Sequence, residues 1–440
     1  MTDYLKLSLL FLFPAFFIIY FFSTIFNSFL NFSFLGFSLQ EIVGVLIVPL
    51  IIEVPQTLVK GIFLPIHALL YKKFGRNAEE QSLAAEVKGY PKVSIIVPAH
   101  NEGEYIQSTL ESLLEDTYPN KEIIVVDDGS TDDTYLKAVQ YTNRPEVMVL
   151  RRERASGRKA KALNYGLLFA SGEILVAVDG DTIIERGSIR RIVEPLLTNP
   201  EVVGVAGNVR VLNKGNVLTR LQAYEYVVSM EMGRRWQGIV SGILVIPGAF
   251  GAFRREIVES LGRMHADTVT EDFDLTLMLQ KVKGKLVFAP SAIAWTHVPE
   301  TWGSWIRQRF RWASGQAQVY RKHLNIFFRR RFGIFGSIVA PNNVFMDMVA
   351  LFIRLAWLAT ISLVHFTSPS YIIRLSALIL SFYLMLESCS IISATLLSPR
   401  KEDIKNAFLA PVMVVFYRPF HSIIRLAAYL SVAMRKKLHW

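Results

Sequence analysis

The chain has 440 residues, of which 52% are hydrophobic and only 19% are charged. This balance excludes a disordered chain and argues against an ordinary soluble enzyme, so we expect part of the chain to lie in lipid. The single cysteine, Cys389, excludes an intramolecular disulfide framework and a cysteine-rich zinc module. The net charge of +11 gathers at the edges of apolar stretches, as in Arg329–Arg331 and Arg400–Lys401. This arrangement is typical of membrane flanks rather than of a nucleic-acid-binding surface.

Residues 1–71 are predicted to form an N-terminal transmembrane region of about two helices. The apolar run from Leu5 to Leu30 carries one charge and exceeds the ~20 residues that a spanning helix needs. A cleaved signal peptide is the alternative, but its apolar core would be shorter, at ~7–15 residues. The second run, from Leu39 to Tyr71, contains three prolines, and we expect a broken or partly interfacial span there.

Residues 72–325 are predicted to form a cytosolic α/β domain. From Pro91 to about Pro290, short β-branched runs alternate with helical patterns, which favours a mostly parallel, Rossmann-like sheet. The expected strands are Val93–Pro98, Glu122–Asp127, Val147–Arg151 and Ile174–Asp179.

Residues 326–440 are predicted to form a C-terminal transmembrane region of about three spans, at Val344–Phe366, Ile372–Leu397 and Ala407–Met434. The charged loop Ser398–Lys405 is expected in the cytoplasm by the positive-inside rule. Three full spans would place the basic tail Arg435–Lys437 outside, against that rule, so the last run either spans or bends, re-enters or lies along the interface. The charges of Arg354, Glu387, Arg418 and Arg425 inside these runs indicate either a polar path or paired helices.

Two polar segments follow the first two predicted strands: Pro98 to Glu102 and Asp127 to Asp133. In an open α/β sheet, ligands bind at the carboxyl ends of the strands. Ser130 or Thr131 is expected to cap a following helix. On its own this turn is weak evidence, because Asp, Gly and Ser dominate turns for structural reasons.

Asp179-Gly180-Asp181 follows the fourth predicted strand, which is strongly apolar. Two carboxylates at this spacing can face one cation, and oxygen ligands suit Mg²⁺ or Mn²⁺. The alternative is a solvated turn, which the apolar strand disfavours. The basic loop Arg151–Lys161 would then neutralise a leaving group, with Arg152 and Lys161 on a solvated helix face.

Thr270-Glu271-Asp272 is typical of a helix start with Thr270 as the cap, and a carboxylate there can act as a general base. The segment from Trp305 to Trp312 places aromatic residues between cations. Such a stripe indicates either a helix in the headgroup region or a platform that stacks on sugar rings. His297 either touches substrate or, as we favour, serves the structure.

Taken in this order, the motifs resemble those of the membrane-embedded family 2 glycosyltransferases, from about Val93 to Trp312. The synthases of poly-β-1,6-N-acetylglucosamine, chitin, hyaluronan and cellulose are the most similar subgroup, because Gly248–Arg255 and Pro299–Thr301 also look like their segments. The resemblance implies a GT-A fold, a nucleotide-sugar donor and Mg²⁺ or Mn²⁺. His100 stands where the family often has an aromatic residue, which leaves nucleotide recognition mostly to the backbone and Glu102.

The resemblance also implies roles for individual residues. It assigns nucleotide-sugar binding to Pro98, Ala99, Glu102, Asp127, Lys159 and Asp179. It assigns the metal to Asp181 with Asp179, and the general base to Asp272. It assigns contacts with the acceptor or the diphosphate to Glu271, Gln308, Arg309, Arg311 and Trp312, with Arg309 or Arg311 facing the departing diphosphate.

The expected activity is that of an inverting, metal-dependent hexosyltransferase at the cytoplasmic face of the cell membrane. It moves a sugar from UDP-GlcNAc or another UDP-hexose to a growing β-linked glycan, processively and with or without coupling to export. One alternative is the transfer of a single sugar to a lipid or lipid-phosphate acceptor. A third reading is an inactive transferase-like scaffold or channel, which the acids present at the metal and base positions disfavour.

Overall fold

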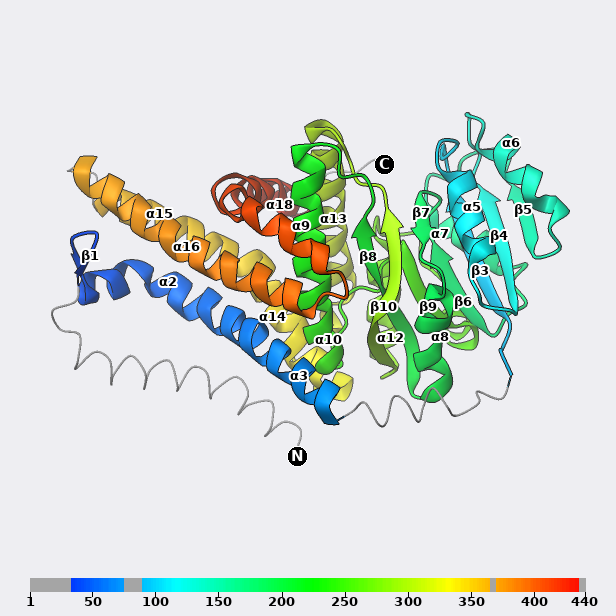
Figure 1. Ribbon diagram of the computed structural model, residues 1–440, viewed down its shortest axis with the longest axis horizontal. Coiled ribbons are helices and arrows are strands. Elements are labelled where there is room, and N and C mark those ends of the chain that lie inside the picture. The colour runs from blue at the N-terminus through cyan, green and yellow to red at the C-terminus, as the bar shows by residue number, and fades with distance from the viewer. Residues whose placement is uncertain (1–32, 75–88, 365–368, 435–440) are drawn as a thin grey trace.

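The computed structural model describes residues 33–74, 89–364 and 369–434. It has two parts: a sheet with helices on its faces, and a group of long apolar helices beside it, with α9 (Val217–Val228) and α13 (Trp302–Lys322) between the two (Figure 1). The predicted first span, Leu5 to Leu30, and the basic tail Arg435–Lys437 lie outside the described residues.

Within the described residues, the sheet has the strand order β5-β4-β3-β6-β9-β8-β10-β7. Its strands are β3 (Val93–Ala99), β4 (Lys121–Asp127), β5 (Val147–Arg151), β6 (Ile174–Val178), β7 (Thr182–Ile184), β8 (Val202–Val211), β9 (Phe250–Arg254) and β10 (Lys285–Thr296). The neighbours β5, β4, β3 and β6 are parallel, and so are β8 and β10. Strand β9 pairs antiparallel with both β6 and β8, and β7 pairs antiparallel with β10. The predicted mostly parallel sheet and its four strands are therefore confirmed.

Helices cover both faces of this sheet, so the central strands are apolar throughout. In β3 every residue is buried: Ile95 packs in one core cluster with residues of α5 and α8, and Ile96 packs in the other with residues of α7 and α12. The helices of this part are α5 (Ile106–Glu115), α6 (Thr134–Val139), α7 (Lys159–Leu167), α8 (Ser188–Thr198), α9, α10 (Arg235–Ile239), α11 (Arg255–Ser260), α12 (Glu271–Lys281) and α13.

The predicted helix cap at Ser130 or Thr131 is wrong. Helix α6 begins at Thr134, and Asp133 occupies its N-cap position. The Ser130 hydroxyl instead accepts a hydrogen bond from the backbone N–H of Asn101 at 3.0 Å, which ties the turn after β4 to the turn after β3.

Four helical segments among the described residues are long and apolar enough to cross a membrane: Leu39–Leu70, Phe335–Leu363, Pro369–Leu397 and Lys401–Ala433. They contain α2 (Leu39–Leu58), α3 (Leu64–Phe74), α14 (Ala340–Val344), α15 (Ala350–Val364), α16 (Pro369–Leu397), α17 (Ala410–Val412) and α18 (Arg418–Ala433), joined by π or 3-10 turns. The last three segments overlap the residues of the three predicted C-terminal spans, and their crossing of a membrane stays a prediction.

The run from Leu39 differs from the expected broken span. It is continuously helical to Phe74, with a π turn η1 (Val59–Phe63) between α2 and α3. Each of Pro49 and Pro55 removes one N–H donor, which a long apolar helix tolerates without ending.

Two charges inside the C-terminal apolar helices, Arg354 and Glu387, have partners on other helices. Arg354 of α15 forms an ion pair with Glu53 of α2, and Arg418 of α18 contacts Glu387 of α16 at 2.7 Å. Of the two sequence readings, paired helices is the one confirmed for Arg354 and Glu387, because each charge has an opposite partner on another helix.

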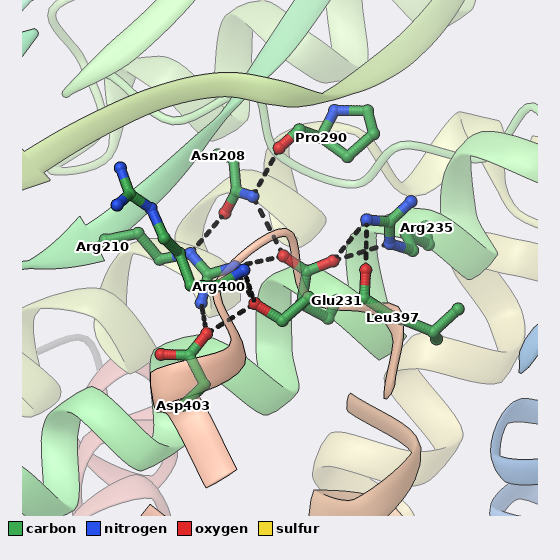
Figure 2. Close-up of polar contacts among 9 residues, drawn as sticks. Asn208, Arg210, Glu231, Arg235, Pro290, Leu397, Arg400 and Asp403 are labelled. Atoms are coloured by element: carbon green, nitrogen blue, oxygen red, sulfur yellow. Dashed lines mark hydrogen bonds and ion pairs between the residues drawn. The ribbon is translucent and has the colours of Figure 1, made fainter. Parts of the chain in front are cut away.

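Four charged residues join the sheet to the connection between α16 and α18, and we call them the junction cluster: Arg210, Glu231, Asp403 and Arg235, of which the first three are buried and Arg235 is half-buried (Figure 2). Arg210 of β8 contacts both Glu231, in the π turn η3 (Ser229–Arg234), and Asp403, at 2.7 Å, in η8 (Lys401–Leu409). Arg235 contacts Glu231 at 2.6 Å and donates to the carbonyl of Leu397 at 2.9 Å. The loop after α16 therefore lies on the same side of the apolar helices as the sheet.

Candidate functional site

A cavity of about 1000 Å³ opens where β3 and β6 end. Its wall includes every site residue predicted from sequence except Asp127: Pro98, Ala99, Glu102, Lys159, Asp179, Asp181, Glu271, Asp272, Gln308, Arg309, Arg311 and Trp312. The structure therefore brings together residues that are up to 214 positions apart in the chain, from Pro98 to Trp312.

The turn after β3 forms the first side of the cavity. Asn101 has a left-handed backbone with φ of 58°, which asparagine tolerates better than most residues. Its side-chain oxygen accepts the N–H of Thr131 at 2.9 Å, and the N–H of Glu102 donates to the Thr134 hydroxyl at 2.8 Å. Burial, followed by the nearby carboxylates of Asp181 and Asp179, raises the pKa of Glu102 to about 8.

Asp127 lies beneath this turn. Its carboxylate is fully buried, accepts the N–H of Ser130 at 3.2 Å and lies 3.5 Å from the guanidinium of Arg151. The next residue, Asp128, lines the cavity, where it accepts hydrogen bonds from Ser156 and lies 3.0 Å from Arg152. Asp128, and not Asp127, is therefore the residue of this pair that a ligand in the cavity can contact.

The Asp179-Gly180-Asp181 turn follows β6. A β-carbon at position 180 would lie 3.0 Å from Cγ of Glu102, so only a very small residue fits between the two acids. Asp181 accepts a hydrogen bond from Thr296 at 3.3 Å, and burial together with the charge of Asp179 raises its pKa to about 6. His297 contacts the backbone carbonyl of Asp181 at 3.1 Å through Nδ1.

These residues fit a divalent metal ion. Glu102, Asp179 and Asp181 are gathered at a place where burial and mutual repulsion disfavour their charged forms, and a hard cation would offset both effects. Their oxygen atoms are the ligand type that Mg²⁺ and Mn²⁺ prefer.

A second acidic group lies elsewhere, at the C-terminal end of α13. Ligand atoms of His265, Asp267 and Asp274 lie within 4.8 Å of one another. The Lys322 ammonium contacts these three side chains at 2.8, 2.8 and 2.7 Å. None of these three side chains lines the cavity, whereas Asp179 and Asp181 both do, so the Asp179–Asp181 turn is the better metal candidate.

Lys159, at the start of α7, lies between the two acidic sides of the cavity. It forms an ion pair with Asp179 and lies 3.8 Å from Glu271. Burial alone would lower the pKa of Lys159, but the charges of Asp179 and Glu271 outweigh burial and raise it. Lys159 is therefore a permanent cation at the point where a diphosphate would meet the metal site.

Asp272 occupies the first turn of α12, and Thr270 holds the N-cap position as predicted. The Thr270 hydroxyl oxygen, however, is buried and makes no hydrogen bond. Asp272 accepts the N–H of Gly248 at 3.3 Å, and a β-carbon at Gly248 would lie only 2.8 Å from the Lys159 ammonium. Burial raises the pKa of the neighbouring Glu271 to about 7, although Lys159 opposes the shift.

Helix α13 carries the Gln308–Trp312 motif. The two arginines of this motif that could face the diphosphate, Arg309 and Arg311, differ in burial. The Arg309 side chain is 1% exposed and contacts Glu225 of α9 at 2.6 Å, whereas Arg311 is half-buried on the cavity wall. Trp305 is fully buried and donates to the Tyr417 hydroxyl at 2.9 Å, so it packs against protein. Trp312 lines the cavity and is 39% exposed.

The cavity extends beyond Trp312 to polar residues of the apolar helices. Asp347 accepts a hydrogen bond from Gln316 at 2.9 Å and lies 2.8 Å from Arg425, and Asn343 joins them on the wall. Sequence reasoning named Arg425 as a charge in a polar path or a helix pair, but it missed Gln316, Asn343, Asp347 and also Arg234 of η3. The only available signal was the presence of polar residues in otherwise apolar runs; nothing distinguishes Arg234 from Arg235 in the sequence.

Comparisons with known proteins agree with this geometry. The sequence profile described as "Glycosyltransferase like family 2" matches residues 91–315. A poly-β-1,6-N-acetyl-D-glucosamine synthase of Staphylococcus epidermidis is 33% identical over 248 residues, which are 56% of this chain and 59% of that protein. The probable glycosyltransferase YdaM of Bacillus subtilis is 34% identical over 267 residues, 59% of this chain and 63% of that protein. The chain thus matches about three fifths of the length of these curated relatives.

Among solved structures, the mannosyltransferase PcManGT from Pyrobaculum calidifontis, in complex with GDP-Man and Mn²⁺, superposes with a TM-score of 0.57 and 19% identity. The match covers 84% of this chain and 99% of that one. At this identity the likeness is evidence for the fold alone.

Proposed function

Because this chain belongs to the family 2 glycosyltransferases and has their GT-A fold, we propose that it moves a sugar from UDP-GlcNAc or another UDP-hexose to a growing β-linked glycan. The observation that carries the proposal is the single cavity shared by Lys159, Asp179, Asp181 and Asp272. The relative named as a poly-β-1,6-N-acetyl-D-glucosamine synthase supports both the donor and the polymeric product.

In this proposal Asp272 is the general base. It removes the proton from an acceptor hydroxyl that lies behind the anomeric carbon, and the first turn of α12 and the Gly248 N–H hold its carboxylate in place. A single displacement inverts the anomeric centre, so an α-linked donor gives a β-linked product. Lys159 and Arg311 stabilise the charge on the departing nucleoside diphosphate. Mg²⁺ or Mn²⁺ bound by Asp179 and Asp181 would neutralise further diphosphate charge.

Pro98, Ala99 and Glu102 hold the nucleotide, together with Asp127 through the turn above it. Glu271, Gln308 and Trp312 contact the acceptor or diphosphate. The cavity extension to Gln316, Asp347 and Arg425 supports an acceptor that reaches into the apolar helices, and coupling of synthesis to export. We place the transferase domain, residues 72–325, in the cytoplasm, between transmembrane regions at residues 1–71 and 326–440.

Product sizing tests the proposal. Membranes or purified protein are incubated with radiolabelled UDP-GlcNAc and other UDP- and GDP-sugars, each with Mg²⁺ or Mn²⁺, and the products are separated by mass. A ladder or a high-mass product is expected. A single lipid-soluble product would overturn glycan extension in favour of single-sugar transfer to a lipid, and the absence of nucleotide release from every donor would overturn the transferase activity.

A further inference from the structure

Arg234 is a cationic wall residue of the cavity to which neither the sequence motifs nor the proposed chemistry gives a role. It is the last residue of the π turn η3, between α9 and α10. Glu231 lies in the same turn, and its ion pairs with Arg210 and Arg235 of the junction cluster fix the position of the turn (Figure 2). Because π turns are uncommon and often lie at functional sites, the position of Arg234 needs an explanation.

Most of the hydrogen-bonding capacity of Arg234 is unused. Its Nη1 donates to the side-chain oxygen of Gln237 at 2.8 Å, and its Nε is buried without a partner. In residues 33–74, 89–364 and 369–434, no carboxylate lies within ion-pair distance of this guanidinium. A guanidinium has five N–H donors, and buried donors without acceptors are costly. The unused donors therefore point to a ligand rich in oxygen acceptors.

The contacts of Arg234 favour a ligand on the side of the base. Gln237 joins Arg234 to the N–H of Leu244, in the wall segment whose Gly248 N–H donates to Asp272. Burial lowers the pKa of Arg234 to about 10 and the charge of Asp272 opposes this shift, so the side chain is charged at neutral pH. The donor side already has its own cation, because Lys159 is paired with Asp179. Arg234 is connected to the wall segment that contacts Asp272 and has no ion pair with Asp179 or Asp181, which favours a contact with the acceptor over one with the nucleotide.

We propose that Arg234 binds the terminal sugar of the acceptor, donating hydrogen bonds to its hydroxyl or carbonyl oxygens next to Asp272. This inference rests on the proposed function. Gln237 positions Arg234, since the Gln237 side-chain oxygen accepts from both the Arg234 guanidinium and, at 3.3 Å, the N–H of Leu244.

The test compares Arg234→Gln and Arg234→Lys in the full-length protein in lipid nanodiscs, with Mn²⁺, UDP-GlcNAc and a titrated β-linked GlcNAc oligosaccharide. UDP release without acceptor reports donor hydrolysis, and UDP release with the oligosaccharide reports transfer. Arg234→Gln is expected to raise the acceptor KM about tenfold or more, with donor KM and hydrolysis changed less than about twofold. Arg234→Lys keeps the charge but loses the planar fork, and it should give an intermediate acceptor KM.

Arg190→Gln is the charge-matched control, because Arg190 is an exposed residue of α8, and it should leave the acceptor KM unchanged. An unchanged acceptor KM in both Arg234 variants overturns the proposal, as does a fall in donor hydrolysis equal to the fall in transfer. If Arg234→Gln does not fold, Arg234→Lys decides by the same two readouts. A wild-type protein that releases no nucleotide from any of the UDP- and GDP-sugars overturns the proposed function itself and the role of Arg234 with it.

Discussion

Gly315 of α13 lies directly against Thr270, the residue before the Glu271–Asp272 pair. A β-carbon at position 315 would lie 2.4 Å from both Cγ2 and Oγ1 of Thr270. Three residues along α13, the Gln318 side chain accepts the N–H of Val269 at 3.2 Å. The helix that carries the Gln308–Trp312 motif therefore sets the position at which α12 starts, and with it the position of Asp272.

This contact predicts the effect of Gly315→Ala. The added methyl group cannot fit without separating α13 from the start of α12, and displacing a catalytic group by about 1 Å can cost on the order of 100-fold in rate. We expect transfer to fall at least about tenfold, measured as UDP release with acceptor. Gly303→Ala in the same helix is the control, because its nearest neighbour would be Arg307 Nη1 at 3.6 Å. Equal activities in the two variants would contradict the prediction.

Asp272→Asn should abolish turnover without abolishing donor binding. The amide keeps the size of the side chain but cannot accept a proton, and general bases contribute roughly 100-fold to 10,000-fold to rates. We expect transfer to fall at least about 100-fold while titration with UDP-GlcNAc still detects donor binding. Transfer near the wild-type rate would show that another group is the base.

Glu271→Gln should stabilise the metal-free protein at alkaline pH. The pKa of Glu271 is about 7 in the folded state and about 4.3 in an unfolded chain. Between these values the unfolded state ionises first, so stability falls as pH rises from about 4 to about 7 and stays low above it. The glutamine variant lacks this loss and should melt higher than wild type at pH 8, with a smaller difference at pH 5. Asp181 titrates in both proteins, so comparing them isolates Glu271.

Features set by contacts between residues close in the chain could be predicted from the sequence, and features set by contacts between distant residues could not. The strands of the sheet and the Asp179–Asp181 turn follow from local periodicity and turn chemistry, and their positions are confirmed. The helix cap at Ser130 was wrong because the Ser130 hydroxyl accepts the N–H of Asn101, in the turn after another strand, and no local pattern records that partner. The ion pair of Arg354 with Glu53 joins residues 301 positions apart, so sequence could indicate pairing but not the partner.

The candidate site divides in the same way. Lys159 and Asp272 could be predicted because each lies in a sequence motif whose residue types indicate the chemistry. Arg234 could not, because it lines the cavity from a π turn whose position depends on the tertiary contacts of Glu231 with Arg210 and Arg235. Arg309 and Arg311 are chemically alike in sequence. Contacts with Glu225 of α9 and with Tyr417 bury Arg309, whereas Arg311 on the same cavity wall is only half-buried. This difference depends on tertiary contacts alone.

Substitution of each arginine should separate their roles. Arg309→Gln leaves the Glu225 carboxylate without its main cation in a buried setting and should cost about 3–5 kcal/mol of stability. Arg311→Gln should lower the melting temperature less than Arg309→Gln, because Arg311 is only half-buried, while transfer falls about tenfold or more. Thermal melting in detergent and UDP release measure the two effects. If Arg309→Gln loses activity without losing stability, then Arg309, rather than a structural ion pair alone, contacts the diphosphate.

Asp403→Asn tests whether the junction cluster holds the sheet against the apolar helices. The carboxylate of Asp403 contacts Arg210 at 2.7 Å and accepts the Ser398 hydroxyl at 2.6 Å, and the side chain is buried. The amide weakens the charged contact, but Glu231 still neutralises Arg210, so we expect a loss of about 1–3 kcal/mol rather than unfolding. The melting temperature should fall by roughly 2–12 °C for a domain of this size.

Glu402→Gln is the matched control for Asp403→Asn. Glu402 is the preceding residue, carries the same charge and is exposed, so its variant should melt within about 1 °C of wild type. Because Glu231 shares the π turn η3 with Arg234, loosening the cluster should also raise the acceptor KM more than the donor KM. If Asp403→Asn melts and binds acceptor like Glu402→Gln, the loop after α16 is not fixed to the sheet through Arg210.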